Sequence, residues 1–240
     1  GGPSCGCKEY CRRPSWRRGG ENVGKPVMAV EVKICGVNSI EAAEATVDAK
    51  YVGFVFYPPS PRAVSPEEAA ALSAHQPDTV TRTGLFVDAD DVAIAAVLAK
   101  APLDLLQLHG EESPERVAAL RDTFGLPVMK AITVASKADV DAADAYFACT
   151  DRLLFDARPP ATMEGALPGG NALAFDWGLL AGRDWPLPWM LSGGLHIGNL
   201  AQAVHVSGAE AVDVSSGVES SLGRKNPVFI RAFIEEAAKL

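Results

Sequence analysis

Cysteine is scarce in this chain, and three of its five cysteines lie within the first eleven residues. The body of the chain keeps only Cys35 and Cys149, a count that does not provide a disulfide framework and is typical of a reducing compartment. Long hydrophobic runs are also missing, because Lys100 and Asp104 interrupt the best candidate for the roughly 18 apolar residues of a spanning helix. The N-terminus has no apolar core of the kind found in signal peptides. We therefore expect a cytoplasmic protein with no membrane partner.

Positive charge is in short supply. The 22 Lys and Arg residues face 30 Asp and Glu residues, which gives a net charge of −8 and argues against nucleic acid as the main partner. The basic residues are concentrated in residues 1–25, which hold six of them against two acidic residues. Residues 1–26 are rich in Gly, Arg, Pro and Cys without periodicity, so we expect a disordered extension there and a catalytic domain over 27–240.

Metal-ligand spacing is absent from the body of the chain. Cys5, Cys7 and Cys11 have the spacing of a metal motif, but no histidine and no second cysteine pair lies near them. The histidines outside the candidate site lack acids or thiols at ligand spacing; they are His75, His196 and His205. We therefore expect no metal site.

Short apolar runs alternate with helical patterns along the body, and the 48% apolar residues of this 240-residue chain suffice for a large core. The expected strands are Val30–Cys35, Tyr51–Phe56, Thr81–Val87, Leu105–Leu108, Val128–Ile132, Leu153–Asp156, Trp189–Leu191 and Ala211–Val214. The expected helices are Ser39–Ala49, Pro66–Ala74, Asp90–Ala99, Pro114–Phe124, Lys137–Phe147, Gly178–Leu180, Ile197–Val206 and Pro227–Ala238. About eight such units predict parallel strands in a closed (β/α)₈ barrel, with a doubly wound open sheet as the alternative.

Three helix starts have recognisable signals. Asn38, followed three residues later by Glu41, is the expected N-cap of the first helix. Ser65 begins a capping box with proline at the first helical position, and Ser113 repeats the combination of cap and proline.

Polar side chains follow the ends of these strands. In a parallel barrel the carboxyl ends of the strands face one mouth, where ligands bind and chemistry takes place. The candidates in order are Cys35, Arg62, Asp88, Gln107, His109, Asp156, Ser192-Gly193-Gly194 and Ser215-Ser216-Gly217. For Cys35 the alternative is an inert core residue, because free cysteine is often buried.

The last two groups suit a phosphate. Small Gly and Ser residues let backbone N–H groups approach an anion, and the loops after strands seven and eight are the usual phosphate site of such barrels. We therefore expect a phosphorylated small molecule as the substrate, although paired glycines also occur in ordinary turns.

The remaining candidates each have two interpretations. Asp156 is either a general acid or the partner of Arg158 in a salt bridge. Arg62 has the bidentate fork that suits a carboxylate, or is a solvated loop charge. His109 is a general acid or base, or a hydrogen-bonded support. We group Gln107 and His109 with Arg62 as expected substrate-binding residues.

Several blocks together are similar to phosphoribosylanthranilate isomerase, an enzyme family of tryptophan biosynthesis. The resemblance covers residues 30–240 and rests on Val32–Gly36, Gly53–Tyr57 with Ser60 and Arg62, Gln107–Gly110, Leu154–Asp156, Phe175–Trp177, Leu191–Leu195 and Val212–Glu219. It implies a small (β/α)₈ barrel without a cofactor that performs the Amadori rearrangement of N-(5′-phosphoribosyl)anthranilate. It also leaves both a monomer and a homodimer open.

The resemblance further implies roles for individual residues. Cys35 is the general base and Asp156 the general acid, and Arg62 holds the anthranilate carboxylate. The Ser192–Gly194 and Ser215–Gly217 loops hold the phosphate. The chain departs from the family at Asn171-Ala172, where the family usually has a residue pair ending in glycine. A positive φ at Ala172 is disfavoured unless the loop differs.

Three other functions are alternatives to this isomerase. A sugar-phosphate epimerase would be expected to have metal-ligand histidines, which are absent here. A bifunctional isomerase of histidine and tryptophan biosynthesis has an aspartate where Cys35 stands. A non-catalytic phosphate-binding protein of the same fold has no need to keep both Cys35 and Asp156.

Overall fold

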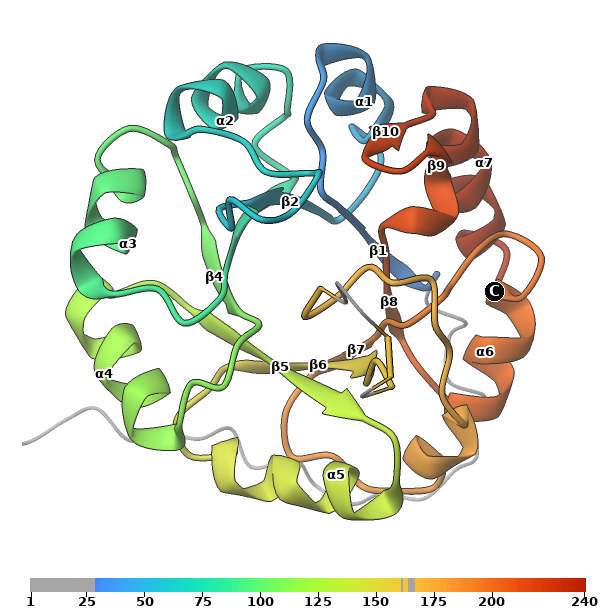
Figure 1. The fold of residues 1–240 in the computed structure, drawn as a ribbon. Helices are drawn as coiled ribbons and strands as arrows, with labels where there is room; N and C mark the ends of the chain where they lie inside the picture. Colours follow the sequence, from blue (N-terminus) through green and yellow to red (C-terminus); the bar gives the residue numbers. More distant parts are fainter. Residues whose placement is uncertain (1–28, 161, 164–166) are drawn as a thin grey trace, which may run out of the picture.

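The computed structural model describes residues 29–160, 162–163 and 167–240, and eight parallel strands close a barrel within them (Figure 1). The strands are β1 Glu31–Cys35, β2 Tyr51–Val55, β3 Thr81–Phe86, β4 Leu105–Leu108, β5 Val128–Val134, β6 Arg152–Ala157, β7 Trp189–Leu191 and β8 Ala211–Val214. Because β1 pairs with both β2 and β8, the predicted barrel is confirmed and the open-sheet alternative is wrong. The expected extension over residues 1–26, with Cys5, Cys7 and Cys11, lies outside the described residues.

Helices form a ring around the barrel (Figure 1). They are α1 Ile40–Ala45, α2 Pro66–Ser73, α3 Asp91–Leu98, α4 Pro114–Phe124, α5 Lys137–Ala142, α6 Leu200–Ser207 and α7 Pro227–Ala237. The 3₁₀ turn η1 (Ala143–Tyr146) follows α5, and the 3₁₀ turn η2 (Trp177–Leu180) lies between β6 and β7. After β8 the chain forms the 3₁₀ turn η3 (Ser216–Val218) and a hairpin of β9 (Glu219–Ser221) and β10 (Arg224–Lys225).

The helix caps agree with the sequence at two of three places. Ser65 forms the predicted capping box, and Ser113 caps α4 with proline at the first helical position. The prediction for α1 is wrong, because Ser39 is the N-cap and accepts a hydrogen bond from Ala42 N. Asn38 instead donates its side-chain amide to the carbonyl of Gly223, in the turn between β9 and β10. The residue that resembles a cap thus ties the β9–β10 hairpin to the start of the chain's first helix.

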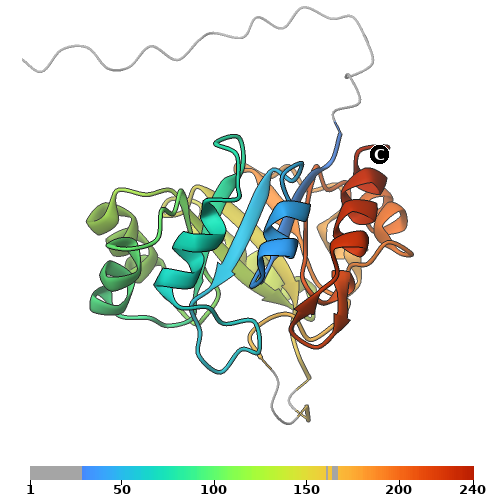
Figure 2. The same ribbon diagram turned by 90° about the horizontal axis from the view of Figure 1, so that it is seen from above.

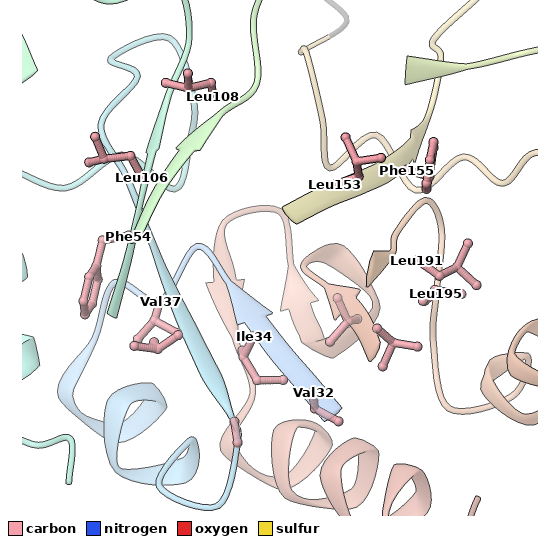
Figure 3. Close-up of a cluster of buried hydrophobic side chains, with 14 of the residues drawn as sticks. Val32, Ile34, Val37, Phe54, Leu106, Leu108, Leu153, Phe155, Leu191 and Leu195 are labelled. Carbon is pink, nitrogen blue, oxygen red and sulfur yellow. The ribbon is translucent and has the colours of Figure 1, made fainter. Parts of the chain in front are cut away.

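Strand periodicity sorts the side chains into an outer and an inner set. Val32 and Ile34 on β1 point toward the surrounding helices and belong to the large apolar layer between barrel and helices (Figure 3). Lys33 and Cys35 alternate with them and therefore point into the barrel. A separate apolar cluster that includes Tyr51 fills the barrel interior away from the mouth.

The carboxyl ends of the strands all lie at one end of the barrel, together with the β9–β10 hairpin (Figure 2). The C-terminus lies at the opposite end (Figure 2). Within the described part of the chain, none of the helices is long and apolar enough to cross a membrane. The polar strand ends therefore meet at a single mouth, which is the place to look for a site.

Candidate active site

A pocket opens at this mouth. It is lined by nine of the predicted site residues, namely Cys35, Arg62, His109, Asp156, Ser192, Gly193, Gly194, Ser215 and Ser216. Gln107, Gly217 and Asp88 are not part of its lining. Strands β1, β2, β3, β6 and β8 each contribute a lining residue, whereas His109 and Ser192 lie directly after β4 and β7.

Cys35 ends β1 and is buried, with its thiol facing the pocket. Lys33 lies two residues earlier on the same face and donates a hydrogen bond of 2.8 Å to Asp213 on β8. Burial raises the pKa of the Cys35 thiol and Asp213 adds to the rise, whereas the charges of Lys33 and Lys225 oppose it. The thiol therefore sits among buried charges of both signs rather than in an apolar core.

Asp156 stands on β6, inside the same pocket. Its Oδ1 accepts a hydrogen bond of 2.9 Å from the backbone N–H of Ala157, and its Oδ2 lies 3.3 Å from His109 Nε2. The alternative that Asp156 pairs with Arg158 is wrong, because Arg158 pairs with Asp139 at the barrel's outer surface. Asp156 is thus free to face a ligand.

His109 lies between Asp156 and Gln107. Gln107 Nε2 is 2.9 Å from His109 Nδ1, and Gln107 itself is completely buried behind the imidazole. When Nδ1 accepts from the amide of Gln107, the ring proton is on Nε2, which is buried, lies 3.3 Å from Asp156 Oδ2 and makes no hydrogen bond in this structure. Gln107 therefore reaches the pocket through His109 and not by lining it.

Arg62 is buried and forms an ion pair with Glu219, which the sequence did not predict. Its Nε and Nη2 donate hydrogen bonds of 2.7 and 3.0 Å to the carboxylate of Glu219, at the start of β9. Lys225 on β10 donates to the same carboxylate at 2.6 Å. Burial works against ionisation of Glu219, but the hydrogen bond from Arg62 and the charge of Lys225 hold its pKa below the ordinary value.

The loop after β6 closes over these groups. A Cβ added to Gly169 would lie 2.7 Å from Asp156 Oδ2, and one added to Gly170 would lie 2.7 Å from Arg62 Nη1. Asn171 fixes the loop, because its side chain accepts from the N–H of Leu167 and donates to the carbonyl of the same residue. A side chain at either position would displace Asp156, His109 or Arg62, and the φ of 75° at Gly170 also favours glycine.

Ala172 ends this loop and has a φ of 56°, in the left-handed region. The backbone thus takes the positive φ for which glycine is the usual residue, and alanine bears the cost of the conformation. The chain therefore has alanine where the family usually has glycine, but its backbone at this position takes an angle that glycine adopts readily.

The two predicted phosphate loops are in contact with each other. Gly193 and Gly194 have φ values of 89° and 62°. Gly217 lies outside the pocket lining, but a Cβ there would be 1.9 Å from the carbonyl oxygen of Leu195, which follows the other loop. Gly217 therefore acts in packing the two loops together.

Six charged or small residues at the site were not among the predicted residues: Lys33, Asp213, Glu219, Lys225, Gly169 and Gly170. Asp213 and Glu219 stand inside the block Val212–Glu219, so their place in that block was a usable signal. Lys225 had none, because its contact depends on the β9–β10 turn. In the part of the chain that the structure describes, no group of three His, Cys, Asp or Glu residues is placed to hold a metal ion.

A family model described as N-(5′-phosphoribosyl)anthranilate isomerase matches residues 32–236. The chain belongs to this family. The N-(5′-phosphoribosyl)anthranilate isomerase of Paramagnetospirillum magneticum is 58% identical over 213 residues, which cover 88% of this chain and 98% of the relative.

Two solved structures of the phosphoribosylanthranilate isomerase family are similar to this one. The enzyme from Thermotoga maritima has a TM-score of 0.77 and 38% identity, and the match covers 88% of this chain and 100% of that one. A phosphoribosylanthranilate isomerase in complex with reduced 1-(o-carboxyphenylamino)-1-deoxyribulose 5-phosphate has a TM-score of 0.73 and 35% identity, with the same coverages.

Proposed function

We propose that this chain isomerises N-(5′-phosphoribosyl)anthranilate to 1-(2-carboxyphenylamino)-1-deoxyribulose 5-phosphate, with Cys35 as the general base and Asp156 as the general acid. The observation that carries the assignment of roles is that a buried thiol and a buried carboxyl line one pocket from different strands of the barrel. Family membership supports the overall reaction, an Amadori rearrangement in tryptophan biosynthesis.

The substrate has three parts, and the pocket offers a partner for each. The loops Ser192–Gly194 and Ser215–Gly217 are proposed to hold the phosphate, with Gly217 acting through the packing of the two loops. Arg62 is held toward the pocket by Glu219 and offers its guanidinium to the anthranilate carboxylate. The ribose then lies between the thiol and the carboxyl group.

The reaction follows from this placement. Asp156 gives its proton to the furanose ring oxygen, the C1′–O bond breaks, and the nitrogen lone pair forms a Schiff base with C1′. The Cys35 thiolate takes the proton from C2′, and the C–H electron pair forms the C1′–C2′ double bond of an enolamine. Tautomerisation moves the O2′ proton away and adds one to C1′, which gives the ketone. Each proton transfer of this kind contributes about 10²–10⁴-fold to the rate.

His109 is proposed to support the acid. An imidazole that presents Nε2–H to Asp156 stabilises the carboxylate that remains after the proton has been given to the ring oxygen. Gln107 holds the imidazole in this orientation, so that its expected role in substrate binding is indirect.

The test is turnover of freshly prepared phosphoribosylanthranilate, followed by the loss of its anthranilate fluorescence. We expect an active wild type and a loss of about 10²–10⁴-fold in kcat for Cys35→Ala and for Asp156→Asn. Cys149→Ala is the matched control, because Cys149 is also a buried cysteine but lies outside the pocket. A folded wild type without turnover contradicts the proposed function, and a fully active Cys35→Ala contradicts the role of the base.

A cytoplasmic location, the absence of a nucleic-acid partner and the choice between monomer and homodimer stay predictions. Light scattering of the purified protein decides between the two oligomeric states.

A further inference from the structure

Lys33 and Cys35 share a small space inside the barrel. Both side chains point inward from β1, and Gly53 on β2 is paired in register with Cys35. A Cβ added to Gly53 would lie 3.1 Å from the Cys35 Sγ and 3.1 Å from the Lys33 Nζ. The missing side chain of Gly53 thus leaves the sulfur and the ammonium next to each other, with no carbon atom of that residue between them.

Lys33 is completely buried, which is costly for a charged group without a partner. Its partner is Asp213, whose Oδ1 accepts the 2.8 Å hydrogen bond from Nζ. The other carboxylate oxygen of Asp213 accepts a 3.0 Å hydrogen bond from the hydroxyl of Ser192. Both oxygens are therefore engaged, and the orientation of the lysine is fixed.

We propose that Lys33 is the positioning residue that makes Cys35 usable as a base, by holding a permanent positive charge beside the sulfur, while Asp213 keeps this lysine charged and in place. The inference rests on the proposed role of Cys35. It adds to that role the group that stabilises the thiolate.

The charges around the sulfur support this division of labour. Cys35 is faced by Lys33 on β1, Asp213 on β8 and Lys225 on β10. Arg62, His109 and Asp156 line the same pocket, and Glu219 accepts hydrogen bonds from both Arg62 and Lys225. The second lysine, Lys225, is thus already held by a carboxylate that it shares with a guanidinium.

Asp213 stabilises the charged form of Lys33. Burial alone lowers the pKa of this lysine, but the charge of Asp213 and then that of Cys35 outweigh it, so that its pKa is raised. Burial has the opposite sign of effect on the thiol, whose pKa rises, and Lys33 is the largest of the groups that oppose this rise. Without the ammonium group of Lys33, burial and the charge of Asp213 both raise the pKa of the Cys35 thiol, and the largest opposing charge is gone.

The experiment measures the thiol directly. The rate of Cys35 alkylation by iodoacetamide is followed against pH, because the thiolate is the reacting form, and the modified peptide is resolved by mass spectrometry from the other four cysteines. The pH at which this rate is half of its maximum is the midpoint. For Lys33→Met we expect the midpoint to rise by about one pH unit or more. At a fixed pH below the midpoint, the alkylation is then about tenfold slower. For Asp213→Asn we expect a smaller rise of the midpoint, because a buried Lys33 without its carboxylate partner is no longer held charged beside the sulfur, and this loss outweighs the removal of the negative charge of Asp213.

Lys130→Met is the matched control. Lys130 is also a buried lysine in a buried ion pair, with Glu112, but it lies on β5 and outside the pocket. We expect it to leave the alkylation midpoint of Cys35 unchanged.

A folded Lys33→Met protein with an unshifted midpoint overturns the proposal. If that variant does not fold, Asp213→Asn decides: a higher midpoint supports the proposal and an unchanged or lower one overturns it. No substrate is present in this measurement. Failure of wild type to turn over phosphoribosylanthranilate therefore counts against the proposed function alone, whereas the midpoints test the coupling between Lys33 and Cys35.

Discussion

The guanidinium of Arg62 and the carboxylate of Glu219 form a two-bonded, buried ion pair, although the two residues lie 157 positions apart in the chain. Arg62 belongs to the loop after β2, and Glu219 begins the hairpin after β8. The pair therefore joins loops from either side of β1 across the mouth of the barrel. Its geometry sets where the guanidinium points, and so where the proposed contact with a substrate carboxylate would form.

Glu219→Gln tests this relationship. The variant keeps the size of the side chain but loses the charge, so that Arg62 is no longer fixed by two charge-assisted hydrogen bonds. We expect kcat/KM for phosphoribosylanthranilate to fall about 10–100-fold, mainly through a higher KM, because a buried pair with one partner removed typically loses several kcal/mol. Glu67→Gln is the control, since its partner Lys100 and Glu67 itself are exposed. Equal effects of the two substitutions would contradict the role of Glu219.

The activity is expected to rise with pH above neutrality. The pKa of Cys35 is raised by burial, and only the thiolate can remove the C2′ proton. Below that pKa the thiolate fraction grows about tenfold for each pH unit, and kcat/KM follows it over the range in which Asp156 keeps the proton that it gives to the ring oxygen. Rates of fluorescence loss at low substrate concentration between pH 7 and pH 9.5 measure this slope. A flat profile over this range would rule out a raised thiol pKa as the limiting ionisation.

His109→Ala is expected to lower kcat about tenfold or more with a smaller change in KM, because the imidazole acts on the acid and not on substrate affinity. Its effect should be much smaller in an Asp156→Asn background, since the two residues are in contact, with a coupling energy of about 0.5–3 kcal/mol. The double-mutant cycle is measured from kcat of the four proteins. His75→Ala, which removes a surface pairing with Glu44, serves as the control. Strict additivity would show that His109 works independently of Asp156.

Ala172→Gly is expected to stabilise the protein by about 0.5–1 kcal/mol, because glycine adopts a φ of 56° without the Cβ clash that alanine suffers there. The opposite sign is expected for Ala201→Gly, at an exposed position of α6, where glycine costs about 1 kcal/mol. Thermal unfolding of both variants gives the comparison. A lower unfolding temperature for Ala172→Gly would contradict this prediction and would show that the alanine side chain contributes more stability than its φ costs.

The barrel and the positions of Cys35 and Asp156 in the pocket were predictable from the sequence, because both follow from local patterns. Alternation places Cys35 and Asp156 on inward faces, and the repeated strand-helix units place those faces at one mouth. The ranges of β4, β7, β8 and α4 agree with the predicted ranges, since each is bounded by clear turn or cap residues.

The rest depends on contacts between distant segments. Asn38 resembles a cap, but the hairpin after β8 offers its amide a better acceptor, and the cap passes to Ser39. Arg158 was a plausible partner for Asp156, but it follows the end of β6, and its side chain forms an ion pair with Asp139 instead. The interaction of Lys33 with Asp213 also needs barrel closure, because it joins the first strand to the last.

The contact between Gly217 and Leu195 makes the two halves of the proposed phosphate cradle one mechanical unit. A side chain at Gly217 has no room unless the backbone after β7 moves, so that a change in one loop displaces the other. In a chimera of two related enzymes, the two loops are therefore expected to function only when both come from the same parent. A loop taken alone from a relative should fit badly even where its own residues are unchanged.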